Sequence, residues 1–281
     1  MMSLFERKKI QFKEPFHNKY RLTILSDIQT GNMSIKTEAG IRWDINVHSI
    51  SEDKIGIEVI TLDNQLIDGN SPLIKNIANA NQIFARIYSE LDLVINNNAK
   101  ILEIRNIELI KEKWSWVKND LKEIQDQDPM IAHVINLNEA QIGDEQLLLD
   151  AINHNEFFSV YFHHLYGNAF HCTTDSVKSK NILNTILLKW DYRIDNIEKE
   201  NQKLDTFKIE GFVETSTSKI KESYKAFSHL DILKLNPKIT EEGKYYLDPS
   251  SGKIVKALLE KKEIVHPQLL YATIKYELEI E

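Results

Sequence analysis

The sequence lacks several residues and patterns that each mark a particular class of protein. Cysteine occurs once in 281 residues, as Cys172, so an internal disulfide is excluded and a reducing compartment is favoured. Glycine and proline are scarce, with 9 and 6 residues, and most of the glycines stand apart from one another. Phosphate-binding loops need closely spaced glycines, so the sequence gives no support to nucleotide binding of the common types.

Long apolar runs are missing as well. No window approaches the roughly 18 apolar residues that a membrane-spanning helix requires. The N-terminal stretch carries charge at Glu6 and Arg7, where a secretory signal peptide would need an apolar run. We therefore expect a cytoplasmic protein with no membrane span. The excess of isoleucine, asparagine and lysine is typical of an AT-rich genome and indicates a bacterial source.

Nor is there an excess of positive charge. Lysine and arginine total 35 against 42 aspartate and glutamate residues, for a formal net charge of −7, so we expect no nucleic-acid partner. The acidic balance would suit a basic protein partner. The basic residues between Arg7 and Lys13 are interpreted as part of a solvated N-terminal extension over residues 1–19.

The sequence does have the 42% hydrophobic and 27% charged residues of a well-packed globular protein. Its most informative stretch is residues 79–122. Apolar residues recur there at helical spacing up to Leu91, form two short runs around the turn at 96–98, and return to helical spacing from Ile107. This pattern predicts a hairpin between two amphipathic helices and carries no catalytic signature.

Alternating apolar and polar residues predict three antiparallel strands before this stretch, at residues 20–29, 41–48 and 55–61. Ser71 and Pro72 predict the start of a helix that runs to about Leu91, because serine can cap free backbone donors and proline suits the first helical position.

The polar break at residues 125–129 is the best candidate boundary between two parts of the chain. Two short helices, at 130–136 and 144–152, would connect them. The second part is again rich in expected strands. Its elements are strands at 157–166, 182–197, 204–214 and 270–280, a helix at 216–227 and a hairpin around 249–252.

These elements predict an α+β protein with one or more long curved antiparallel sheets and helices packed on the concave face. The expected divisions are an extension (1–19), a first α+β half (20–125), a helical connector (126–156) and a second α+β half (157–281). In one alternative the halves form a single domain, and in another they are similar in structure. The order of elements resembles half-barrel lipid and lipoprotein carriers, which are exported. Without an export signal, the resemblance assigns neither a family nor residues.

The densest set of chemically interesting side chains is His154, His163, His164, His171 and Cys172. Zinc prefers such ligands, but adjacent residues on a strand point opposite ways and the spacing matches no metal motif, so we expect no metal and no cofactor. A thiol beside an imidazole suggests a nucleophile, yet an inert cysteine is favoured. We therefore expect no catalytic residue. An enzyme with a His-rich site assembled in space is the alternative.

Aromatic residues supply the candidate contact sites. Phe158, Phe162 and Tyr166 share one face of the expected strand at 157–166, while Trp116 lies off the apolar stripe of its helix. Core packing is the favoured interpretation, and contact with a partner or an apolar ligand is the alternative for which these four residues are our candidates.

The sequence as a whole predicts a non-enzymatic cytoplasmic binding protein of the chaperone, adaptor or immunity type. It would hold a segment of another protein or an apolar ligand, through an exposed strand edge or an apolar concavity. The alternatives are the His-rich enzyme and a structural subunit of a larger bacterial assembly, which would form an oligomer.

Overall fold

The computed structural model describes residues 9–125, 129–169, 172–174, 176–197, 203–227, 230–231 and 234–281. Within these residues, twelve strands form one antiparallel sheet. The strands are β1 (Phe16–Thr30), β2 (Met33–Ile50), β3 (Ile55–Gly69), β4 (Glu90–Ile95), β5 (Ile101–Ile104), β6 (Cys172–Thr173), β7 (Val177–Lys180), β8 (Leu187–Asn196), β9 (Asp205–Val213), β10 (Lys238–Leu247), β11 (Ile254–His266) and β12 (Leu270–Ile280). The helical elements are α1 (Pro72–Ala85), the 3₁₀ turn η1 (Arg86–Tyr88), α2 (Ile107–Gln125), α3 (Pro129–Gly143), α4 (Glu145–Asn153), the π-helix η2 (Phe158–Phe162) and α5 (Thr217–Glu222).

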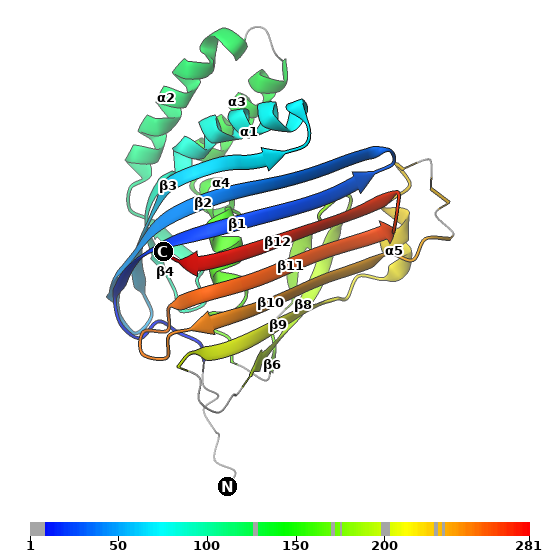
Figure 1. The fold of residues 1–281 in the computed structure, drawn as a ribbon. Helices are drawn as coiled ribbons and strands as arrows, with labels where there is room; N and C mark the ends of the chain where they lie inside the picture. The colour runs from blue at the N-terminus through cyan, green and yellow to red at the C-terminus, as the bar shows by residue number, and fades with distance from the viewer. Residues whose placement is uncertain are drawn as a thin grey trace.

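The centre of the sheet joins strands from opposite ends of the sequence. The strand order is β5-β4-β3-β2-β1-β12-β11-β10-β9-β8-β6, and β7 also pairs with β8. Leu22 on β1 lies opposite both Ile41 on β2 and Leu278 on β12, so the two strand-rich parts of the sequence share one sheet (Figure 1). The prediction of an antiparallel sheet accompanied by helices is confirmed. The division into similar halves stays a prediction.

Period-two alternation gives the sheet one buried face and one solvated face. We call the buried one the covered face; it carries, among others, Tyr20, Leu22, Trp43, Tyr245 and Leu278. We call the other one the open face; it carries, among others, Arg21, Thr23, Arg42, Lys244 and Glu277.

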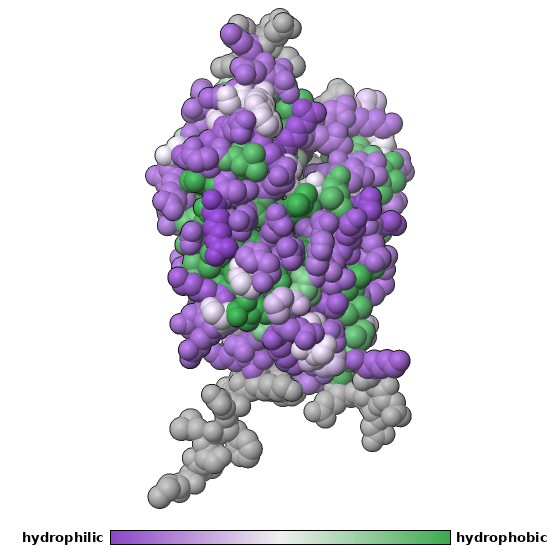
Figure 2. Space-filling model, turned by 90° about the vertical axis from the view of Figure 1, so that its left-hand side faces the viewer, coloured by the Kyte–Doolittle hydropathy of each residue, from purple (hydrophilic) through white to green (hydrophobic). Residues whose placement is uncertain are grey.

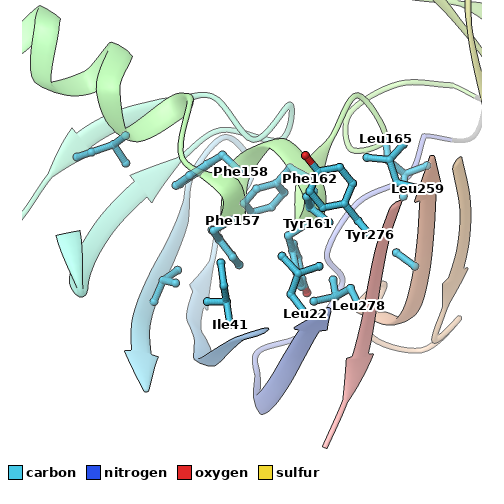
Figure 3. Packing of buried hydrophobic residues seen from close by; sticks show 14 of the residues in the cluster. Leu22, Ile41, Phe157, Phe158, Tyr161, Phe162, Leu165, Leu259, Tyr276 and Leu278 are labelled. Carbon is cyan, nitrogen blue, oxygen red and sulfur yellow. The ribbon is translucent and has the colours of Figure 1, made fainter. Parts of the chain in front are cut away.

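Residues 157–166, which we call the central segment, lie against the covered face. Figure 3 shows the side chains of Phe157 and Tyr161 pointing towards Ile41 and Leu22 of the sheet. The ring of Phe157 lies 5.2 Å from that of Trp43, and the hydroxyl of Tyr161 lies 3.3 Å from that of Tyr20. The centre of the core therefore lies between the central segment and strands β1, β2 and β12.

The prediction of a strand at 157–166 is wrong, because the structure has the π-helix η2 and a following series of turns there. A short run of apolar residues is compatible with a buried strand or a buried helix, and periodicity alone does not separate them. Here the run is enclosed on several sides, since Phe157, Val160 and Leu165 are all nearly inaccessible to solvent. The apolar character reflects complete burial and not a sheet covered on both faces.

Other boundaries differ by shorter stretches. The first helix ends at Ala85 and not near Leu91, because Leu91 pairs with Val59 in the sheet. The strand expected from residue 182 begins at Leu187, since Asn181 binds the backbone amides of residues 185 and 186 and holds a turn. The expected strand at 270–280 is confirmed, as is the helix from Ile107. Residues 126–128 of the expected boundary lie outside the described residues.

The turn between β10 and β11 requires glycine at position 252. Gly252 has φ of +74°, and a Cβ added to it would lie 2.0 Å from the carbonyl oxygen of Gln11. We expect Gly252→Ala to lower the free energy of unfolding by about 2 kcal/mol or more, because left-handed backbone alone costs about 1–2 kcal/mol in other residues. Chemical denaturation measures this. Gly143→Ala is the control, since a Cβ there has nothing within 4 Å; equal losses in both variants would contradict the prediction.

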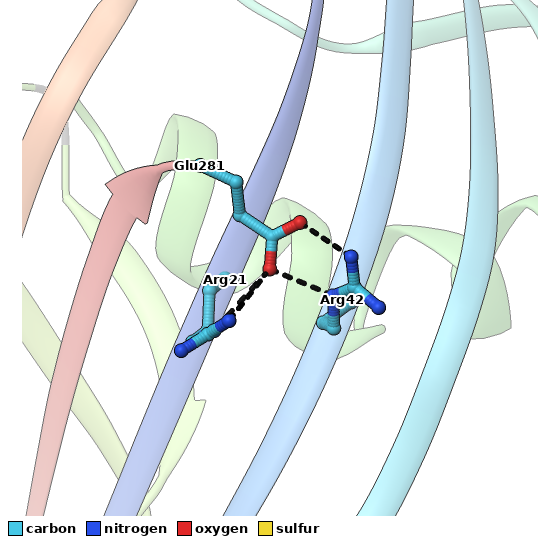
Figure 4. Close-up of polar contacts among 3 residues, drawn as sticks. All are labelled: Arg21, Arg42 and Glu281. Atoms are coloured by element: carbon cyan, nitrogen blue, oxygen red, sulfur yellow. Dashed lines mark hydrogen bonds and ion pairs between the residues drawn. The ribbon is translucent and has the colours of Figure 1, made fainter.

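The open face is held by charge pairs that cross between strands. Glu281 receives hydrogen bonds from Arg42 at 2.6 and 2.7 Å and from Arg21 at 3.2 Å, so it bridges β1 and β2 just after β12 ends (Figure 4). These bonds hold the pKa of the Glu281 carboxyl below its usual range. Exposed pairs of this kind contribute little each to stability, and they identify a solvated face.

Among the described helices, none has the length and apolar character needed to cross a membrane.

Candidate functional site

A hollow of about 450 Å³ crosses the open face from β1 to β9. Its outward-facing apolar side chains are Leu25 on β1, Leu258 on β11 and Ile197 immediately after β8. Its charged side chains are Lys208, Glu242, Lys244, Glu260, Lys275 and Glu277. The hollow therefore combines apolar groups with charges of both signs, as a site for an amphipathic ligand would.

Two leucines interrupt the polar pattern of the open face. Leu25 lies opposite Lys275, and Leu258 lies opposite Glu277 on one side and Lys244 on the other. Strand alternation turns both leucines outward, where they are 44% and 37% exposed. They provide apolar area in the middle of a charged surface.

A second hollow of about 430 Å³ adjoins the first, because Glu242 lines both. It is bounded by β9, β10 and the start of α5, and it includes the exposed ring of Phe212. We call the two hollows together the open-face groove. The groove runs across the strands, roughly from β1 towards α5.

A second candidate site is a buried polar cluster on the covered face. Nε2 of His163 lies 2.6 Å from Oε1 of Glu241, and Nζ of Lys261 lies 3.2 Å from the same oxygen. The side chains of His163 and Glu241 are only 2% and 6% exposed. The His164 ring lies 4.9 Å from that of His163 and 4.3 Å from that of Tyr192. The cluster joins the end of η2 to β8, β10 and β11.

The environment fixes the charges in this cluster. Burial by itself raises the pKa of Glu241, but Lys261 and His163 outweigh it and lower that pKa to about 2. Burial, assisted by repulsion from His163, lowers the pKa of His164 to about 3. Near neutral pH Glu241 is ionised and His164 is neutral. The Glu241 carboxylate lies within hydrogen-bond distance of His163 and forms an ion pair with Lys261, so the cluster fits anchoring of the central segment to the sheet.

The candidate contact residues divide into two groups in the structure. Phe158, Phe162 and Tyr166 are 5%, 2% and 3% exposed and belong to the core. The hydroxyl of Tyr166 donates to the backbone oxygen of Gly252 at 2.8 Å. Trp116 is 53% exposed and lines a hollow of about 410 Å³ between α2 and η1. Contact by these residues with a partner or ligand stays a prediction, and Trp116 alone among the four is placed at the surface.

The histidines are only partly brought together. His163 and His164 are in contact, although the sequence placed them on opposite faces of a strand; the π-helix ends there, and His163 has φ of +44°. His154 is exposed, with Nδ1 2.6 Å from the backbone oxygen of Asp150. His171 and the side chain of Cys172 lie outside the described part. Within that part, no group of three or more His, Cys, Asp or Glu side chains could hold a metal.

Several residues of both sites escaped the sequence analysis. Leu25 and Leu258 carried a signal, since each is an apolar residue directly beside an apolar residue that faces the core, out of phase with its strand. Glu241 and Lys261 carried none, because a charged residue looks the same in sequence whether it faces solvent or a buried histidine. Their partnership depends on how the central segment docks on the sheet.

Comparisons with known proteins give little further information. No family model matches the sequence, and no curated protein matches it. Among solved structures, the chain is similar to one described as "Lipid-protein interactions in lipovitellin", with a TM-score of 0.44 and 10% identity. The match covers 97% of this chain and 25% of the lipovitellin chain. A likeness at this level carries no argument about function.

Proposed function

We propose that this protein is a non-enzymatic, cytoplasmic binding protein that holds an apolar ligand in the open-face groove. The observation that carries the proposal is the pair of outward leucines, Leu25 and Leu258, within a hollow of about 450 Å³. Ligand sites are concave and mostly apolar with a few polar groups, and the volume falls in the usual range for small molecules.

The proposal includes a sheet that curves around the central segment, with the covered face concave. In support, Figure 3 draws strands on both sides of the central segment. The concave face would then be occupied by the protein's own aromatic side chains, such as Phe157 and Phe162. A ligand would bind on the open face and not beside the helices.

A protein segment added as an extra strand has less support. The outer strands are β5 at one end of the sheet and β6 and β7 at the other, with four, two and four residues, and β7 carries Lys178 and Lys180. Short edges with lysine are a common means of preventing edge-to-edge pairing. This favours the apolar ligand over a partner strand.

Binding of the uncharged fluorescent probe N-phenylnaphthylamine tests the proposal. We expect the wild type to bind it and Leu258→Glu to bind at least about tenfold more weakly, because burying one leucine contributes about 1.5 kcal/mol or more. Leu137→Glu is the control, since Leu137 is 51% exposed on α3 and lies away from the groove. Absence of binding, or equal loss in both variants, would refute the proposal.

A second candidate function, contact with another protein, is favoured by Trp116. Exposed tryptophan in a hollow is typical of an interface anchor. We expect a photo-crosslinking residue at position 116 to give one discrete protein adduct in native lysate, and the same residue at the exposed position Lys111, on another side of α2, to give none. Identical adduct patterns at both positions would argue against a specific contact.

The remaining roles from the sequence have less support. Catalysis at His163 and His164 would require a substrate to reach the His163 ring, which is 2% exposed, beside the half-buried His164. A structural subunit would need a broad apolar patch, whereas the face in Figure 2 shows hydrophobic residues as small islands among hydrophilic ones. The chaperone, adaptor and immunity roles stay predictions.

A further inference from the structure

We propose that the ligand of the open-face groove is an amphipathic anion, an acyl chain whose carboxylate or phosphate head binds Lys244. This inference rests on the proposed function and names the class of ligand. It follows from the charges that the groove leaves unpaired and from their position beside the two leucines.

Most charged side chains in the groove already have partners. Lys275 pairs with Glu260 at 3.4 Å, and Glu277 binds Lys256. Lys208 binds Glu210, and Glu242 lies close enough to Lys208 to raise its pKa further. These groups offset one another without a ligand.

Lys244 differs from the other cations of the groove. Within the described residues it forms no ion pair, and its ammonium lies 5.0 Å from the centre of the Tyr246 ring. Its direct neighbour on β9 is Lys208, whose ammonium binds Glu210 and is therefore not available to a ligand in the same way. An anion bound at Lys244 would give this ammonium a charged partner, and hydrogen bonds between ionised groups are the stronger ones. The positive end of the site is therefore at Lys244.

The apolar part of the groove begins beside this lysine. Leu258 is the neighbour of Lys244 on β11, and Leu25 lies two strands further on, on β1. Three strand spacings separate β10 from β1, which is about 14 Å. A medium-length acyl chain with its head at Lys244 would lie over both leucines. The order of cation and leucines therefore matches the order of head and tail in such a ligand.

Calorimetric titration with dodecanoic acid, dodecyl phosphate, dodecanol and dodecyltrimethylammonium tests this inference. We expect the wild type to bind one or both anions at least about tenfold more tightly than the alcohol, and to bind the ammonium compound most weakly. The affinities for dodecanoic acid and dodecyl phosphate show whether the site prefers a carboxylate or a phosphate head. Lys244→Gln should bind acid and alcohol equally. Lys54→Gln should keep the preference, because Lys54 is exposed in the turn between β2 and β3 and lies outside the groove lining.

The outcomes separate this inference from the proposed function. If the wild type binds the alcohol as tightly as the anions, or the ammonium compound more tightly, the anionic head is refuted while the apolar site stands. If Lys244→Gln keeps the preference, Lys244 is not the head-binding residue. If none of the four compounds binds, both the inference and the proposed function fail.

Discussion

Replacing Phe157 by alanine is expected to lower the free energy of unfolding by about 3–5 kcal/mol. Phe157 is 1% exposed, and its ring lies 5.2 Å from those of Trp43 and Phe158 and 5.1 Å from that of Tyr161. Alanine would leave a cavity at the contact between the central segment and the sheet. Neighbouring aromatic rings are too rigid to fill that space, so the loss should be near the upper end of the range.

Urea denaturation followed by tryptophan fluorescence measures this loss. Phe212→Ala is the matched control, because the Phe212 ring is 47% exposed on the open face. We expect the control to change stability by less than about 1 kcal/mol. A loss of under about 1 kcal/mol in Phe157→Ala would show that the central segment contributes little to the core.

The second large effect is expected from removing the charge of Glu241. Glu241→Gln should destabilise the protein by about 3–5 kcal/mol. The substitution would leave Lys261 and His163 without the buried carboxylate that they contact. Glu277→Gln serves as the control on the open face, since the side chain of Glu277 is 49% exposed and contributes little. Equal stability of the two variants would contradict the assignment of a buried ion pair.

The same cluster predicts the direction of the pH dependence. In the folded state the pKa of Glu241 falls from its ordinary 4.5 to about 2, and that of His164 falls from 6.5 to about 3. In both cases the unfolded state binds the proton at a higher pH than the folded state does. The group's contribution to the free energy of unfolding is therefore fully present above its ordinary pKa and is lost as the pH falls. The contribution of His164 is lost between about pH 6.5 and 3, and the contribution of Glu241 between about pH 4.5 and 2.

Denaturation curves collected across this range separate the two groups. Glu241→Gln should make the dependence less steep below about pH 4.5, and His164→Phe should remove the part that begins near pH 6.5. Each group contributes up to about 1.4 kcal/mol per pH unit. A wild type whose stability is constant from about pH 6 to pH 3 would refute the proposed charges.

The sequence was sufficient to predict elements whose pattern is decided by one neighbouring surface. Residues 270–280 alternate because one side of β12 faces the core and the other faces solvent. The helix from Ile107 repeats its apolar residues at intervals of three and four for the same reason. The central segment has no such single surface, so its pattern could not indicate its conformation.

Prediction of the sites was limited for a related reason. The sequence could mark single residues, such as Trp116, whose exposure follows from the helix that carries it. It could not bring Lys244 beside Leu258, because strand register depends on the turn at 248–253 and on a bulge at the end of β10. Nor could it bring His163 to Glu241, which are 78 positions apart.

The central pair of strands has a consequence for how the protein is made. Arg21 and Glu281 are in contact although 260 positions separate them, and β1 finds its β12 partner only after nearly all of that length has been translated. At up to about 20 residues per second, the ribosome needs on the order of ten seconds to deliver β12. During that time one border of β1 has no partner strand, so the nascent chain is most exposed to misassociation before its last hairpin appears.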